Sequence, residues 1–338
     1  MENEKNEFQK KELPEELLKE ALQKYNLSDS LLEEIREIRQ YLHTNPELSG
    51  EEYKTTEFIK KFLTEHDIKI LPFTLKTGVI AEIGEGEKIV ALRADIDALP
   101  INEMTDYPYK SQNDGVMHAC GHDFHTASLL GAAKVLKERE KELKGMVRLI
   151  FQPAEEINAG AKEVIASGAL EEVSAIAGIH NKPDLPLGTI GIKSGPLMAA
   201  VDRFEVKING TGTHAAAPQN GNDPIVTASQ IVTSIQSIVS RYVSPADMAI
   251  ISVTRISGGN TWNVIPESVV MEGTMRTFKE SVQERIKKLF VQVIKNYTEA
   301  FDQKYEILWG DAHSFVDNDK ILAEVIGKEA SIFADVKI

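Results

Sequence analysis

Two segments of the 338-residue sequence carry residue types that bind metals or move protons. The segment MHACGHDFHT contains the only cysteine, Cys120, two positions before His122. The segment FQPAEE ends on two adjacent carboxylates, Glu155 and Glu156. Thiolate, imidazole and carboxylate groups are the usual ligands of zinc and similar first-row ions. We therefore expect a metal site in which one carboxylate coordinates and its neighbour moves a proton.

Each of these residues also has a purely structural interpretation. A lone cysteine is usually a small buried hydrophobic residue, His122 could cap a helix, and an acidic pair is usually solvated. The Cys-Gly-His triplet lies between two further histidines, and the acidic pair follows Pro153 at the end of a predicted strand, so both patterns favour the chemical interpretation. The other histidines of this region and of the chain ends are expected outside the metal shell: His43, His66, His118, His125 and His313.

The remaining candidates come directly after predicted strands. Short β-branched runs predict three strands, at 88–94, 146–151 and 175–179. The first leads into Asp95 and Asp97, the second into the acidic pair, and the third into His180, while 124–138 is helical. Strands that alternate with helices predict a mostly parallel sheet covered on both faces, with ligands at the carboxyl ends of its strands. We expect all these side chains to meet at that edge.

The pattern changes after residue 193. Residues 194–311 follow the order β-α-β-β-α-β with one apolar face per strand, which is typical of a ferredoxin-like α+β domain. We predict an α/β catalytic domain of residues 31–193 and 312–338, interrupted by this inserted domain. Residues 1–30 are charge-dense with a thin apolar stripe, so they are expected to form an N-terminal arm.

Composition and charge limit the classes of partner that the protein can have. The net charge is −14, and the sequence has no cluster of Lys and Arg, which argues against nucleic acid. The N-terminal segment has no signal-peptide pattern, and no apolar run approaches about 18 residues, so we expect a cytoplasmic protein with no membrane partner. One cysteine excludes an internal disulfide. A small-molecule substrate is the favoured partner.

The sequence resembles the amidohydrolase branch of the aminoacylase/carboxypeptidase-type co-catalytic metallopeptidases. This branch includes N-acyl-amino-acid amidohydrolases, hippurate hydrolases and auxin-conjugate hydrolases. The resemblance rests on seven motifs in matching order: LRADIDALP, MHACGHDFHTA, FQPAEE, GIHNKP, GTGTHAAAPQNGNDPI, GGNTWNVIP and EGTMRTF. Any one of them alone would be weak, but together they are highly specific.

The resemblance implies two divalent ions, with Zn, Mn and Co as candidates. The implied ligands are Cys120, which bridges both ions, His122 and His180 at one site, and Glu156 at the other. Glu155 matches the general base of the family. Asp97 matches a carboxylate that orients a ligating imidazole.

Three further residues are implied in the inserted domain, which the resemblance makes a dimerisation or lid domain. His214 matches a histidine that stabilises the oxyanion in the active site of the partner subunit, so a homodimer or higher homo-oligomer is expected. Asn263 and Arg276 match residues that hold a free carboxylate, so the substrate is an N-acyl amino acid or a short peptide. From the residues alone, they could equally be turn and surface residues.

We expect Glu155 to deprotonate a metal-activated water that attacks the acyl carbonyl. The family supplies one more histidine ligand near its C-terminus, whereas no histidine follows His313 here, and we expect a truncated sequence. One alternative is an impaired homologue that binds metal or acyl-amino acid without efficient turnover. Another is a thiol enzyme in which His122 or His125 activates Cys120; metal chelation would leave its thiol reactive.

Overall fold

The computed structural model describes residues 27–337, and at positions 311–313 it describes the backbone only. Most of the expected N-terminal arm therefore lies outside the described residues. The chain divides into two compact units, Met1–Gly191 with Gly327–Ile338, and Ile192–Ile326, called the first and second unit below. The predicted inserted domain, residues 194–311, begins close to the start of the second unit. It ends at residue 311, whereas the second unit continues to Ile326. Within residues 27–337, no helix is both long and apolar enough for a membrane span.

The first unit is built on a five-stranded sheet of order β1-β2-β4-β3-β5. Its strands are β1 (Lys69–Ile70), β2 (Val79–Ile83), β3 (Ile89–Asp95), β4 (Met146–Gln152) and β5 (Val173–Gly178). β3 runs parallel to both β4 and β5, whereas β2 runs antiparallel to β4 and to β1. The sheet is thus mixed, and the three strands expected to lead into the site are its parallel part.

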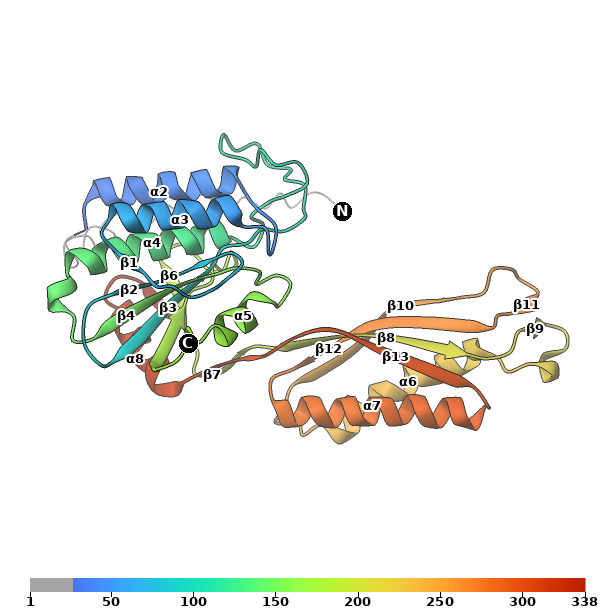
Figure 1. Cartoon of the computed structure of the whole chain (residues 1–338). Coiled ribbons are helices and arrows are strands. Elements are labelled where there is room, and N and C mark those ends of the chain that lie inside the picture. Colours follow the sequence, from blue (N-terminus) through green and yellow to red (C-terminus); the bar gives the residue numbers. More distant parts are fainter. Residues whose placement is uncertain (1–26, 338) are drawn as a thin grey trace, which may run out of the picture. The chain divides into compact units, whose positions relative to one another are not determined.

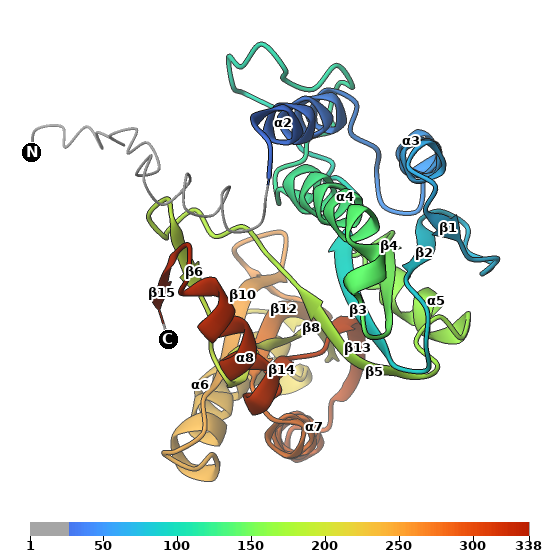
Figure 2. The same ribbon diagram turned by 90° about the vertical axis from the view of Figure 1, so that its left-hand side faces the viewer.

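Apolar side chains cover both faces of this sheet. Leu149 and Phe151 of β4 belong to a core under α2 (Asp29–Thr44), α3 (Tyr53–Glu65) and α4 (His122–Glu138). Ile150, between them, belongs to a second core with α5 (Gly160–Ala166) on the opposite face. Figures 1 and 2 show the three longer helices together on one side of the sheet. Successive side chains of β4 are buried on opposite faces, so the sheet is held between two layers.

The first unit also contains a two-stranded parallel sheet. β6 (Thr189–Gly191) pairs in parallel with β15 (Asp335–Lys337), which follows α8 (Lys320–Ala330). In the second unit, β7 (Gly195–Met198) pairs antiparallel with β14 (Val316–Asn318). The chain therefore enters and leaves the second unit through neighbouring strands.

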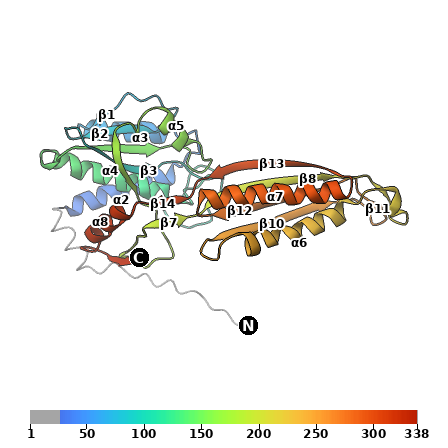
Figure 3. The same ribbon diagram turned by 90° about the horizontal axis from the view of Figure 1, so that it is seen from below.

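The body of the second unit is an antiparallel sheet of order β10-β12-β8-β13. Along the chain, its elements are β8 (Ala200–Asn209), α6 (Pro224–Tyr242), β10 (Ala249–Gly258), β12 (Ser268–Thr277), α7 (Glu280–Ala300) and β13 (Lys304–His313). Both helices lie on one face, over a common apolar core (Figure 3). A separate two-stranded pairing joins β9 (Thr213–His214) and β11 (Val264–Ile265).

Candidate metal centre

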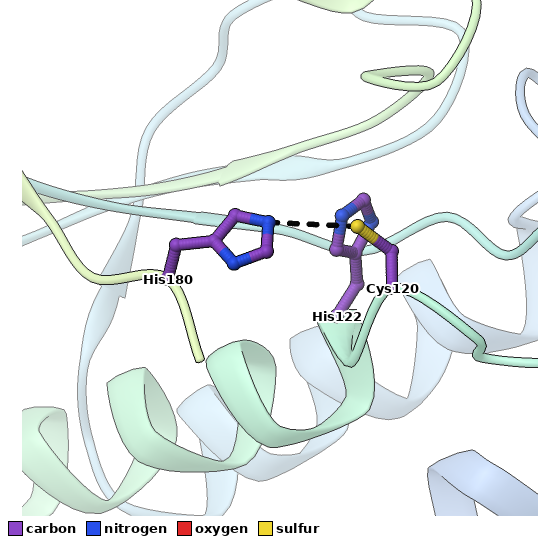
Figure 4. Close-up of side chains that lie close together, drawn as sticks. All are labelled: Cys120, His122 and His180. Atoms are coloured by element: carbon purple, nitrogen blue, oxygen red, sulfur yellow. Dashed lines mark hydrogen bonds between the residues drawn. The ribbon is translucent and has the colours of Figure 1, made fainter. Parts of the chain in front are cut away.

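A left-handed glycine positions the first two candidate ligands. Gly121 has φ +85° and immediately precedes α4, whose first residue is His122. This turn brings the sulfur of Cys120 back over the helix N-terminus, 3.5 Å from Nε2 of His180, which follows β5 (Figure 4). A Cβ on residue 121 would lie 2.4 Å from the side-chain oxygen of Asn181. Glycine is therefore required here both for its φ and for the close approach.

His122 is held by a carboxylate on one nitrogen, whereas its other nitrogen faces carboxylates without a hydrogen bond. Nδ1 lies 3.1 Å from Oδ1 of Asp97, and the side chain is completely buried. Nε2 lies 3.7 Å from Oε1 of Glu156. Within the described part of the chain, neither of these two buried atoms has a hydrogen-bond partner. Such unpaired buried atoms are costly, and a cation between them would satisfy both.

The acidic pair follows β4 on a strained turn. Ala154 has φ +47°, and the next two residues are Glu155 and Glu156. The Glu156 amide donates to Oδ2 of Asp97 at 3.0 Å, so one aspartate fixes both the imidazole and this turn. Two groups of potential metal ligands result, each with its ligand atoms within 4.8 Å of one another and sharing His122. They are Cys120, His122 and His180, and His122, Glu155 and Glu156.

The electrostatics of the centre favour positive charge. Burial opposes the charged form of His122, but the hydrogen bond to Asp97 and the nearby Cys120 and Asp95 side chains outweigh it and raise the pKa of His122 to about 11. Contacts with His122 and His180 lower the pKa of the Cys120 thiol. The contact with Cys120 raises the pKa of His180 to about 8. Raised histidine pKa values and a lowered thiol pKa both reflect a negatively charged centre, and its thiolate, imidazole and carboxylate donors fit divalent ions.

A third group, Asp95, His122 and His125, is also close enough for a metal, but His125 has no nitrogen to spare. Its Nδ1 contacts Oδ1 of Asp95 at 2.6 Å, and its Nε2 accepts from the Asn181 amide at 2.9 Å. Burial raises the pKa of Asp95, but the hydrogen bond with His125 and the Arg93 guanidinium hold that pKa well below its usual range. The prediction that His125 stays outside the metal shell is compatible with these contacts.

The predicted residues of the second unit fall into two places. His214 on β9 pairs with Val264 on β11, and the carbonyl of Asn263 accepts from the Ala215 amide at 2.9 Å, so His214 and Asn263 are neighbours. Arg276 lies near the far end of β12. From Ser268 to Arg276 the strand extends roughly 25 Å, since strands rise about 3.3 Å per residue. Within one copy of this unit, Arg276 is therefore far from His214 and Asn263.

Sequence reasoning missed two residues that support the centre. Asn181 directly follows a candidate ligand, and this adjacency was a usable signal. Glu52 is fully buried and contacts the backbone of Ala154, 102 positions away. Nothing in the sequence around Glu52 indicates that contact.

Thiolate, imidazole and carboxylate donors at the carboxyl edge of parallel strands define a metal-dependent enzyme. Residues 91–308 match the model of peptidase family M20/M25/M40. The N-acetyl-L-cysteine deacetylase of Bacillus subtilis is 53% identical over 311 residues, which are 91% of this chain and 74% of that protein. The N-acyl-L-amino acid amidohydrolase of Geobacillus stearothermophilus is 41% identical over 83% of this chain and 76% of its own.

A solved structure gives the same result. The YXEP protein of Bacillus subtilis, described as a dinuclear metal binding peptidase from the M20 family, superposes with a TM-score of 0.80 at 44% identity. The match covers 92% of this chain and 82% of that one. The chain belongs to peptidase family M20/M25/M40. It is a metal-binding hydrolase that acts on amide bonds.

Proposed function

We propose that this chain hydrolyses the amide bond of N-acyl amino acids, and that Glu155 is its general base. The observation that carries the proposal is two buried atoms without a hydrogen-bond partner, Nε2 of His122 and Oε1 of Glu156, which face each other at 3.7 Å beside the carboxylate of Glu155. The names of the two relatives, a deacetylase and an amidohydrolase of N-acyl amino acids, support the substrate class.

The ligand set proposed for two divalent ions is Cys120, His122, His180 and Glu156. Bound ions would supply a Lewis acid for the acyl carbonyl and would activate water near neutral pH. Asp97 fixes the tautomer of His122, because its carboxylate accepts from Nδ1 and leaves Nε2 free to coordinate. Zinc, manganese and cobalt all accept this mixed donor set.

Proton transfer falls to Glu155. Its neighbour Glu156 is the better placed ligand, since its amide is fixed by Asp97 and its Oε1 points at His122. Burial raises the pKa of Glu156, which a bound cation would reverse. Glu155 is left to accept the proton of the attacking water and to return it to the leaving amine.

Recognition of the free carboxylate is proposed for Asn263 and Arg276, with His214 stabilising the oxyanion. Because Arg276 lies roughly 25 Å along β12 from the end nearest Asn263, one copy of the second unit does not bring both to one small substrate. We infer that two copies share each site, so the active species is a homodimer or a higher oligomer. The lid and dimerisation role of the second unit is part of this proposal.

Release of free amino acid from N-acetyl and N-benzoyl amino acids tests the function, after loading with Mn²⁺, Co²⁺ or Zn²⁺. The protein should turn over these substrates, and Glu155→Gln should lose about 10²–10⁴-fold in kcat. Asp114→Asn, in an exposed loop, is the matched control and should be unaffected. A loaded protein that releases no amino acid from any of them would contradict the proposal. Activity that survives chelation would instead favour a thiol nucleophile at Cys120.

Shared sites are tested by mixing two inactive variants. His214→Ala and Glu155→Ala subunits, mixed after dissociation, should regain activity, because some mixed dimers contain one site with both residues intact. Each variant alone is the control. A mixture as inactive as its components would mean that each chain completes its own site.

A further inference from the structure

Glu52 is a buried carboxylate that serves backbone amides. It is 0% exposed and immediately precedes α3. Its Oε1 accepts from the amides of Gly50 at 2.9 Å and Ala154 at 2.8 Å, and its Oε2 accepts from the Thr77 hydroxyl at 2.6 Å. Within residues 27–337 no ion pair contains Glu52. A carboxylate held only by neutral donors is expensive to bury, so its hydrogen bonds are what keep it there.

The amide that Glu52 holds belongs to a turn that needs holding. Ala154 has φ +47°, a left-handed conformation that side chains other than glycine adopt at a cost. Its carbonyl accepts from the Gly160 amide at 3.1 Å. The preceding residue, Pro153, is closely surrounded by two glycines. A Cβ added to Gly160 would lie 1.6 Å from the Pro153 carbonyl oxygen, and one added to Gly78 would lie 2.7 Å from the Pro153 ring. The turn is therefore fixed tightly around Pro153 and Ala154.

The turn carries both acidic residues of the centre. Asp97 fixes it on the C-terminal side, through the amide of Glu156, and Glu52 fixes it on the N-terminal side, through the amide of Ala154. Glu155 lies between these two points. We propose that Glu52 is a positioning residue that holds Glu155 in its working orientation by clamping the strained turn. This inference rests on the proposed function, in which Glu155 is the general base.

The two contacts of Oε1 suggest a clean pair of variants. Both backbone amides bind the same oxygen, so Glu52→Gln keeps an acceptor there and can donate to the Thr77 hydroxyl from its amide nitrogen. Glu52→Met has a similar length but no comparable acceptor. Glu47→Met is the matched control, because Glu47 also accepts backbone amides, those of Lys54 and Thr55, but at the start of α3.

The first measurement is hydrogen exchange of the segment 150–160, which needs neither metal nor substrate. Glu52→Met should exchange faster there than the unmodified protein, whereas Glu52→Gln and Glu47→Met should not. If Glu52→Met does not fold, Thr77→Val removes the donor to Oε2 and should give the same pattern at smaller size. Unchanged exchange of this segment in every Glu52 and Thr77 variant that folds would overturn the clamp.

The second measurement is steady-state hydrolysis by the metal-loaded protein. Glu52→Met should lose about 10- to 100-fold in kcat with KM little changed, because a misplaced base weakens the chemical step. Glu52→Gln should recover most of that loss, and Glu47→Met should keep kcat while losing thermal stability. An equal loss in Glu52→Gln and Glu52→Met would refute a role as acceptor. If the unmodified protein proved inactive, the proposed function would fail, while the exchange result would still decide the clamp.

Discussion

Asp97 makes three hydrogen bonds through its two oxygens, two of them to residues of the metal centre. Oδ1 faces Nδ1 of His122 at 3.1 Å, and Oδ2 accepts from the Glu156 amide at 3.0 Å and from the Ser49 hydroxyl at 2.7 Å. Burial raises the pKa of Asp97, but these hydrogen bonds, led by that with His122, outweigh burial and lower it. Asp97 is thus an ionised acceptor that serves an imidazole and an amide at once.

Replacing Asp97 by asparagine should therefore weaken metal binding. An asparagine has one acceptor oxygen, so it can serve His122 or the Glu156 amide but not both. We expect a 10- to 100-fold loss of affinity, as is typical for partners of ligating histidines. Calorimetric titration of the metal-free protein with Zn²⁺ measures it. Ser49→Ala, which removes only a donor, should cost much less, and equal losses in both variants would contradict this account.

His43 shows how a histidine outside the centre can still be charged. Its Nδ1 lies 2.9 Å from Asp123 and its Nε2 lies 3.2 Å from Glu103, so both nitrogens face carboxylates and both must donate. The hydrogen bond to Asp123 raises the pKa of His43 above its ordinary value, although burial and the Arg39 guanidinium oppose it. The ring of His118 is also nearby, and burial lowers its pKa to about 4, so it faces His43 uncharged.

The stability contributed by His43 should therefore depend on pH. A raised folded pKa means that the contribution is fully present below about pH 6.5, the ordinary pKa of histidine, and is lost as pH rises through the folded value. Relative to His43→Gln, the unmodified protein should be more stable by about 1 kcal/mol at pH 6 and by less at pH 9. Urea unfolding at both pH values measures this. A difference that grows with pH would contradict the charged state.

At the scale of elements, the start of α4 depends on a turn that only glycine fits well. Gly121→Ala should cost about 1–2 kcal/mol for the left-handed conformation, and its Cβ would also displace Asn181 beside the candidate ligand His180. Gly115→Ala is the matched control, since Gly115 has φ +77° and open space around it. Both variants should lose stability, but only Gly121→Ala should also lose metal affinity. Equal metal affinities would separate this turn from the centre.

Elements with a clear pattern were predictable from the sequence, and short or irregular ones were not. The predicted runs at 88–94 and 146–151 lie within one residue of β3 and β4, and the β-α-β-β-α-β order of the second unit is observed. β2, with sequence VIAEI, was not predicted, nor were the two- to four-residue strands. Such short segments have too few positions to display a period.

The same limit applies to the centre. The motifs of Cys120, His122 and the acidic pair were predicted to lie close together, because the carboxyl ends of parallel strands share one edge of the sheet. The roles of these residues, the bridging of two ions by Cys120 and the cytoplasmic location stay predictions. Contacts such as that between Glu52 and Ala154 depend on how loops fold across the sheet, and no local pattern encodes them.

At the scale of the whole molecule, the two units have separate cores, and the tryptophan probes belong to one of them. Both tryptophans, Trp262 and Trp309, belong to the second unit, while the candidate ligands belong to the first. Tryptophan fluorescence therefore reports unfolding of the second unit only.

Metal removal should consequently affect the two units differently. An ion at 100 times its Kd stabilises the unit that binds it by about 2.7 kcal/mol. Far-UV circular dichroism follows the helices and strands of both units, so a chelator should move only part of its transition to lower temperature. The fluorescence transition should stay nearly unchanged. Adding excess Zn²⁺ back after chelation is the control and should restore the original transition. Coincident shifts of both signals would mean that the units unfold as one.

The neighbouring strands β7 and β14 also bear on the order of folding. β6 and β15, the parallel pair of the first unit, are separated in the chain by residues 192–334. Closing a loop of that length costs entropy, and the cost falls when the loop is already compact. A folded second unit holds Met198 beside Val316, which replaces most of that loop by a short connection. During synthesis, the inserted unit would thus be complete before β15 emerges, and its folding would guide β15 back to β6.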